Sequence, residues 1–99
     1  MTTSKQQTAF YRKLYLAHLI SQAPQNIAGL QTLTGMPRRT LQDTLKTLAD
    51  IGIQCSFVQQ SGERNNAGFY EIHSWGPIDP QWIKQNTAVL EATLGIEPQ

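Results

Sequence analysis

Apolar residues in the middle of the chain recur every three or four positions, in two runs separated by a turn. The first run follows Asn26, a residue type that caps helix N-termini, and stops at Gly35. The second run begins at Pro37, and proline is a residue type that the first turn of a helix accepts. The apolar members are Ile27, Leu30 and Leu33 in the first run and Leu41, Leu45 and Leu48 in the second. The pattern predicts a helix-turn-helix unit with helices over about residues 26–34 and 37–50.

The predicted helix of residues 37–50 has two chemically different faces. Its leucines fall on one side, and long hydrogen-bonding side chains gather on the other. This combination is what a DNA recognition helix requires. Two arginines in the first turn oppose the helix dipole, which favours acidic groups there, and this local cost indicates a use in phosphate or guanine contacts. The candidate DNA contacts on this helix are Arg38, Arg39, Thr40, Gln42 and Lys46.

A simpler interpretation of the same helix stands beside the DNA-binding one. Arginines at a helix start often form only a solvated face. In that case Asp43 and Asp50 would pair with Arg39 and Lys46 at helical spacing.

Residues 53–75 carry the pattern of a β-hairpin. Residues 53–59 alternate apolar and polar side chains, and residues 69–75 form a second extended run. The intervening residues 60–68, QSGERNNAG, have the glycines and asparagines of a turn. The alternating apolar positions of the first strand are Ile53, Cys55 and Phe57. We expect Cys55 to be a small core residue.

The tip of the predicted hairpin offers further candidate DNA contacts in Arg64 and Asn65. The competing interpretation is a loop selected for turn geometry and solubility, because Glu63 cancels the charge of Arg64.

The segment TGMPRRTLQDTLKTLADIGI, followed by a strand, a turn and a strand, resembles the core of bacterial winged helix-turn-helix domains. It is similar in particular to a family of uncharacterised bacterial proteins described as winged-helix DNA binders, and the resemblance covers about residues 10–75. It implies a mostly α fold with a small β-hairpin, a winged helix-turn-helix with a three-helix core and a two-stranded wing. It also implies a transcriptional regulator that places helix 37–50 in the major groove of double-stranded DNA, with the 60–68 wing alongside.

The first helix is predicted to start near Ser4, which forms a capping box with Gln7. From Ala9 to Ala23 its apolar residues fall nearly all round the helix, so it must be covered on two sides. The helix-turn-helix unit is one cover. The second is a C-terminal helix, a partner chain, or both.

A final helix is predicted over about residues 80–94. Asp79 provides the cap, Pro80 occupies the first position, and Gly95 ends the helix. In the winged-helix superfamily an added terminal helix often mediates dimerisation, which implies a homodimer through the first and last helices with Trp82 as an anchor. The alternative is that this helix packs back on the first helix.

Bulk properties limit these interpretations. A length of 99 residues predicts one domain spanning 1–99. The net charge of +1 gives no strong electrostatic signal for nucleic acid, which favours the alternative of a non-enzymatic protein-interaction module that retains the fold without binding DNA. Because the sequence shows neither a signal peptide nor a membrane-spanning stretch, we expect a cytoplasmic protein with no membrane partner.

Catalytic and metal-binding patterns are missing from the sequence. It contains no glycine-rich phosphate loop, no nucleophile elbow and no metal-ligand spacing. The cysteine is single, and His18 and His73 are the only histidines. We therefore expect neither an enzyme nor a cofactor or metal site.

Overall fold

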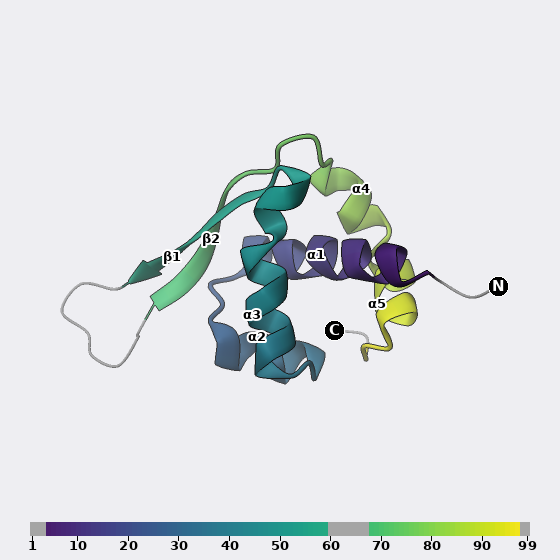
Figure 1. Cartoon of the computed structure of the whole chain (residues 1–99), viewed down its shortest axis with the longest axis horizontal. Coiled ribbons are helices and arrows are strands. Elements are labelled where there is room, and N and C mark those ends of the chain that lie inside the picture. Colours follow the sequence, from purple (N-terminus) through teal and green to yellow (C-terminus); the bar gives the residue numbers. More distant parts are fainter. Residues whose placement is uncertain (1–3, 60–67, 98–99) are drawn as a thin grey trace.

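The computed structural model describes residues 4–59 and 68–97 (Figure 1). Helix α1 runs through the centre of the molecule, and α2 and α3 pack on one side of it. The β-hairpin reaches outward from the end of the α3 segment, and α4 and α5 lie on the side of the molecule away from the hairpin's outer end. The elements, in chain order, are α1 (Lys5–Gln22), α2 (Ile27–Thr34), α3 (Arg38–Lys46), the 3-10 helix η1 (Leu48–Ile51), β1 (Gln54–Gln59), β2 (Gly68–Ser74), α4 (Pro80–Gln85) and α5 (Thr87–Leu94). The predicted fold class is confirmed.

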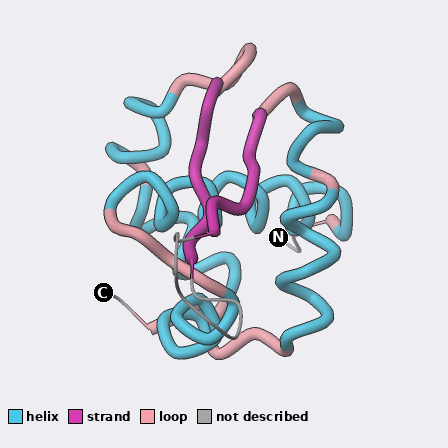
Figure 2. Tube along the Cα trace, turned by 90° about the vertical axis from the view of Figure 1, so that its left-hand side faces the viewer, coloured by secondary structure: helices cyan, strands magenta, loops and turns pink. Residues whose placement is uncertain are grey.

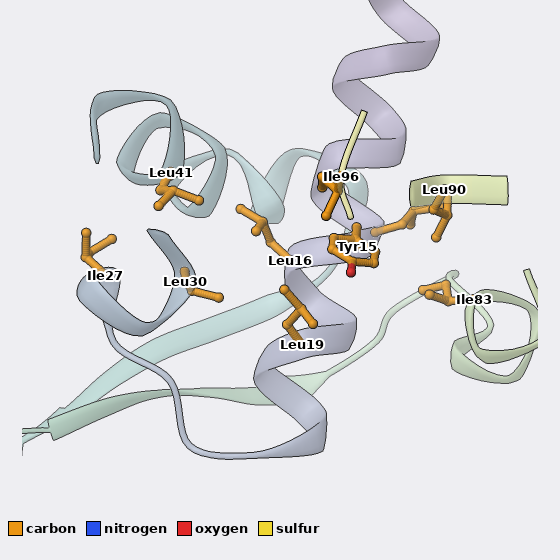
Figure 3. Close-up of a cluster of buried hydrophobic side chains, with 10 residues drawn as sticks. Tyr15, Leu16, Leu19, Ile27, Leu30, Leu41, Ile83, Leu90 and Ile96 are labelled. Carbon is orange, nitrogen blue, oxygen red and sulfur yellow. The ribbon is translucent and has the colours of Figure 1, made fainter. Parts of the chain in front are cut away.

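Helix α1 is covered on two sides, as its sequence requires. The Ser4 hydroxyl accepts a hydrogen bond from the backbone N–H of Gln7 at 3.0 Å, which confirms Ser4 as the cap. The Gln7 side chain donates to the Tyr11 hydroxyl at 3.2 Å, so only the Ser4 half of the predicted capping box is shown. Figure 3 shows Leu16 on the side of α2 and α3, and Tyr15 facing the C-terminal helices. The buried residues of α1 are Leu14, Tyr15, Leu16, Ala17, Leu19 and Ile20. The second cover is therefore provided by α4 and α5 of the same chain.

A polar contact lies within this second interface. The Tyr15 hydroxyl donates a hydrogen bond of 2.8 Å to Glu91 Oε2 on α5, and both residues are buried. A buried carboxylate is costly unless it is hydrogen-bonded, so this bond helps to fix α5 against α1. The half-buried His18 is one turn further along α1, with its ring centroid 6.4 Å from that of Tyr15.

The helix-turn-helix unit has the predicted start and turn. The Asn26 side chain accepts a hydrogen bond from the N–H of Gly29, and Gly35 ends α2 with a φ of 73°. Helix α3, however, ends at Lys46, and the predicted continuation to Asp50 is the separate helix η1. Between them the Thr47 hydroxyl donates to the backbone carbonyls of α3, which accompanies the tightening of the last turn.

The hairpin is an antiparallel pair with Phe57 opposite Tyr70 and Cys55 opposite Ile72. The N–H of Tyr70 donates to the carbonyl of Gln25 at 2.8 Å, which ties the hairpin to the connector between α1 and α2. Figure 2 shows the two strands running side by side in front of the helices. Of the predicted turn at 60–68, residues 60–67 lie outside the described residues, and Gly68 begins β2.

The C-terminal helix is divided at Asn86, whereas the sequence predicts one helix over 80–94. The Asp79 side chain caps α4 by accepting from the N–H of Gln81 at 2.9 Å, as expected. The Asn86 side chain then donates to the carbonyl of Trp82 at 2.7 Å, and its backbone leaves helical geometry at φ −118° and ψ 20°. The break allows both Ile83 and Leu90 to be fully buried.

No helix within residues 4–59 and 68–97 combines the length and apolar character that spanning a bilayer requires.

Two glycines bring distant loops into backbone contact. Gly52, which ends η1, and Gly76, which follows the hairpin, both have positive φ, at 90° and 58°. A Cβ on Gly76 would collide with the carbonyl oxygen of Gly52 and lie 2.8 Å from its carbonyl carbon. Gly95 also has a positive φ of 71°, but nothing lies within 4 Å of the position its Cβ would take.

We expect Gly76→Ala to destabilise the protein more than Gly95→Ala. The left-handed conformation costs an L-residue about 1–2 kcal/mol in both variants, and only Gly76→Ala adds a collision with backbone. Urea unfolding of both variants and the native chain measures the difference. Equal losses of unfolding free energy would contradict the close approach.

We expect His18 to reduce stability in acid. Burial lowers the pKa of His18 below its ordinary value of 6.5. The Glu91 carboxylate acts in the opposite direction and raises this pKa, and the Lys84 ammonium lowers it further. The unfolded chain therefore binds this proton more tightly, and stability present above pH 6.5 is lost as the pH falls through the lower folded value. Urea unfolding at about pH 8 and about pH 5 measures the loss, which His18→Gln should reduce. The exposed His73→Gln is the control, and an equal effect of both variants would contradict the assignment.

Candidate nucleic-acid interface

The outer face of α3 presents polar side chains to solvent. Arg39, Gln42 and Lys46 are exposed, while Leu41 on the opposite side is fully buried. The two-faced helix that the sequence predicts is therefore present, although a contact of these residues with DNA stays a prediction. This face carries donors and acceptors that suit base edges and phosphates.

The N-terminus of α3 holds two exposed arginines. Pro37 is the N-cap residue, with no side-chain hydrogen bond, and Arg38 and Arg39 follow it directly. Arg38 lies near Tyr70 of the hairpin. Burial and the Cys55 thiol raise the pKa of the Tyr70 phenol, and the Arg38 guanidinium acts in the opposite direction.

The alternative interpretation of α3 is that acidic neighbours form ion pairs with its cationic side chains, and the described residues do not show these ion pairs. Within residues 4–59 and 68–97, neither Arg39 nor Lys46 forms an ion pair with Asp43 or Asp50. The cationic groups of this face are therefore available to an external anion.

The threonines of α3 face inward more than its other polar residues. Thr44 is buried, and its hydroxyl donates to the carbonyl of Thr40 at 2.7 Å. Thr40 itself is half-buried, so it is the least accessible of the contacts predicted on this helix. Arg64 and Asn65, predicted at the hairpin tip, lie outside the described residues.

A groove runs between α3 and the hairpin. It consists of two adjoining hollows of about 400 Å³ and about 470 Å³, which share Gln42, Phe57 and Tyr70. Arg38 and the start of α2 line the first hollow, and Lys46 lies in the second. The remaining lining residues are Asn26, Ile27 and Ala28 in the first hollow and Asp43, Leu45, Cys55 and Ser56 in the second.

The groove contains residues that the sequence did not indicate as functional. The alternation of the first strand predicts Phe57 on a buried face with Ile53 and Cys55. Ile53 is indeed fully buried and Cys55 half-buried, but Phe57 is 41% exposed and lines the groove beside α3. Gln54, Ser56 and Gln59 are polar and exposed, and they were the available signal that β1 has no extensive buried face.

The described residues show no group of three or more histidine, cysteine or acidic side chains able to hold a metal ion. Burial raises the pKa of the Cys55 thiol, and a backbone hydrogen bond from Glu71 acts in the opposite direction. Because burial is the larger effect, the inert neutral thiol is favoured. His73 hydrogen-bonds Ser56 on the exposed face of the hairpin.

Comparison with known proteins agrees with this architecture. A family model described as winged helix-turn helix matches residues 5–94. A solved structure of a DUF2131 family protein from Shewanella amazonensis SB2B is 53% identical in sequence, with a TM-score of 0.89. The match covers 95% of this chain and 96% of that chain. No curated protein matches this chain.

Proposed function

The chain belongs to the winged helix-turn-helix family, and we propose that it is a cytoplasmic transcriptional regulator that binds double-stranded DNA. Helix α3 enters the major groove, and the hairpin lies alongside. The residues proposed to contact DNA are Arg38, Arg39, Thr40, Gln42, Lys46, Arg64 and Asn65.

The outer face of α3 is the observation that carries this proposal. Arg39 and Lys46 are exposed and unpaired within the described residues, while Leu41 anchors the helix to the core from the opposite side. A rigid helix with an outward row of charged and amide side chains suits a major groove, which admits one α-helix.

The low charge of the chain determines the expected mode of binding. With a net charge of +1, little non-specific attraction to the phosphate backbone is available. Affinity must then come mainly from specific hydrogen bonds. Because each neutralised phosphate contributes about −0.9 to the slope of log affinity against log salt, that slope should be shallow.

We expect Arg39→Ala and Lys46→Ala to weaken duplex binding, whereas Lys84→Ala on α4 should not. All three variants remove one positive charge from an exposed position, so the comparison separates location from net charge. Loss of a base contact should reduce affinity about 5- to 150-fold, and loss of a phosphate contact should reduce the salt slope by about 1. Gel-shift titration against genomic fragments at low and moderate salt measures both quantities.

The same titration distinguishes the second candidate, a protein-interaction module that retains the fold. Its support is the near-neutral charge. Such a module would give no retarded band at either salt concentration. Equal binding by the Arg39, Lys46 and Lys84 variants would place the contact elsewhere on the molecule.

We also propose that two copies associate through the first and last helices. An aromatic row crosses from α1 to α4, with ring centroids 6.3 Å apart for Phe10 and Tyr11 and 6.4 Å apart for Tyr11 and Trp82. Phe10 is 37% exposed and Trp82 is 41% exposed. A two-fold dimer pairs the same patch on both copies and matches the two half-sites that helix-turn-helix dimers bind.

We expect Trp82→Lys to convert the dimer to a monomer, because it places a charge in the centre of the apolar contact. Phe57→Lys on the hairpin is the matched control, since Phe57 has the same exposed fraction of 41%. Sedimentation velocity over a concentration series measures the association. A native chain that stays monomeric throughout the series would refute the dimer.

A further inference from the structure

Phe57 is exposed, yet its ring packs against two neighbours of the hairpin. Its ring meets that of Tyr70 edge-on, with centroids 5.1 Å apart and planes at 69°. It also lies over Gly68, where a Cβ would come within 2.8 Å of the Phe57 ring atom Cζ. The bare glycine thus leaves room for the ring, and the edge of Tyr70 supports it. The ring is preorganised although 41% of the residue remains accessible to solvent.

Polar and charged groups surround this aromatic pair. Gln42 of α3 is shared by both hollows of the groove, as Phe57 and Tyr70 are. Arg38 lines one hollow, and Lys46 lines the other together with Asp43. The groove therefore has an aromatic centre, an amide beside it and a cation in each half.

Double-stranded DNA could contact the amide and the cations of the groove, but its stacked bases could not stack on the exposed ring. In a duplex each base is stacked between its neighbours, so its face is hidden and only its edges are readable. An exposed ring gains stacking energy only from a base that has left the stack. Aromatic side chains combined with cations that follow the backbone are typical of proteins that bind single strands.

We propose that the groove between α3 and the hairpin binds an unpaired segment of a nucleic acid strand. One base stacks on Phe57, and the Gln42 amide, which both donates and accepts, bonds the edge of a base. The adjacent phosphates are held mainly by Arg38, because Asp43 beside Lys46 repels an anion. This site goes beyond duplex recognition. It shares Arg38, Gln42 and Lys46 with the proposed duplex surface, but Arg39 does not line the groove, and Phe57 is not a proposed duplex contact.

The native chain alone provides the first test. We expect a fluorescently labelled thymidine oligomer of about ten nucleotides to bind more tightly than an abasic oligomer with the same number of phosphates. A uridine oligoribonucleotide in parallel shows whether DNA, RNA or both supply the strand. Fluorescence anisotropy measures the affinities. Equal binding of thymidine and abasic oligomers, or binding of no oligomer, would overturn the proposal.

A matched pair of variants provides the second test. We expect Phe57→Leu to weaken binding of the thymidine oligomer about 5- to 150-fold, the range for loss of one stacked base. Phe69→Leu should leave it unchanged, because Phe69 lies next to Tyr70 on β2 but lines neither hollow of the groove. Phe57→Trp should restore binding, because it restores an aromatic face. Thermal melts establish that each variant is folded.

The outcomes separate this inference from the proposed regulator function. If the affinity for the thymidine oligomer depends on Phe57 but not on Arg39, the groove site is supported, whether or not any duplex is retarded in the gel. Equal affinities of the folded Phe57→Leu and Phe69→Leu variants would refute the groove site, while leaving the Arg39-dependent binding of duplex DNA unaffected.

Discussion

The structure depends on burying α1 on two sides. Six consecutive or near-consecutive residues of this helix are buried, from Leu14 to Ile20, and each fully buried leucine or isoleucine contributes about 1.5–3 kcal/mol. Helices α2 and α3 and strand β2 cover one side of α1, and helices α4 and α5 cover the other side. Because α3 is held against α1 through Leu41, its outer face is fixed in orientation without using any polar side chain. The polar face of α3 can therefore vary without loss of the core.

Helical periodicity was sufficient to predict which side of α3 is buried. The spacing of Leu41, Leu45 and Leu48 separates the core face from Arg39 and Lys46 in the sequence as clearly as in the structure. Strand alternation was less informative at Phe57. A period of two identifies the residues that share a face, but not whether that face meets another element at that point. The groove depends on where the hairpin passes α3, which is a tertiary property.

The helix breaks at Thr47 and Asn86 were also beyond local reasoning. At both sites a side chain donates a hydrogen bond to a backbone carbonyl of the preceding turn. Thr32 makes the same kind of bond to the carbonyl of Ala28 at 3.1 Å, yet α2 continues through it. The bond therefore permits a break but does not cause one. What differs is the tertiary requirement: η1 leads into the hairpin, and the break at Asn86 lets α5 return along α1.

The distribution of exposed aromatic groups follows from the same architecture. Phe57 lies on the hairpin beside α3, whereas Trp82 lies on α4 beside Tyr11 of α1, so the two exposed rings belong to different surfaces. A second copy placed on α1 and α4 would leave α3 and the groove of both copies open. In a chain of net charge +1, contacts through apolar rings and amides can supply binding energy that phosphate attraction does not. Low charge and exposed aromatic rings thus support a recognition mode that depends on shape and stacking more than on electrostatic attraction.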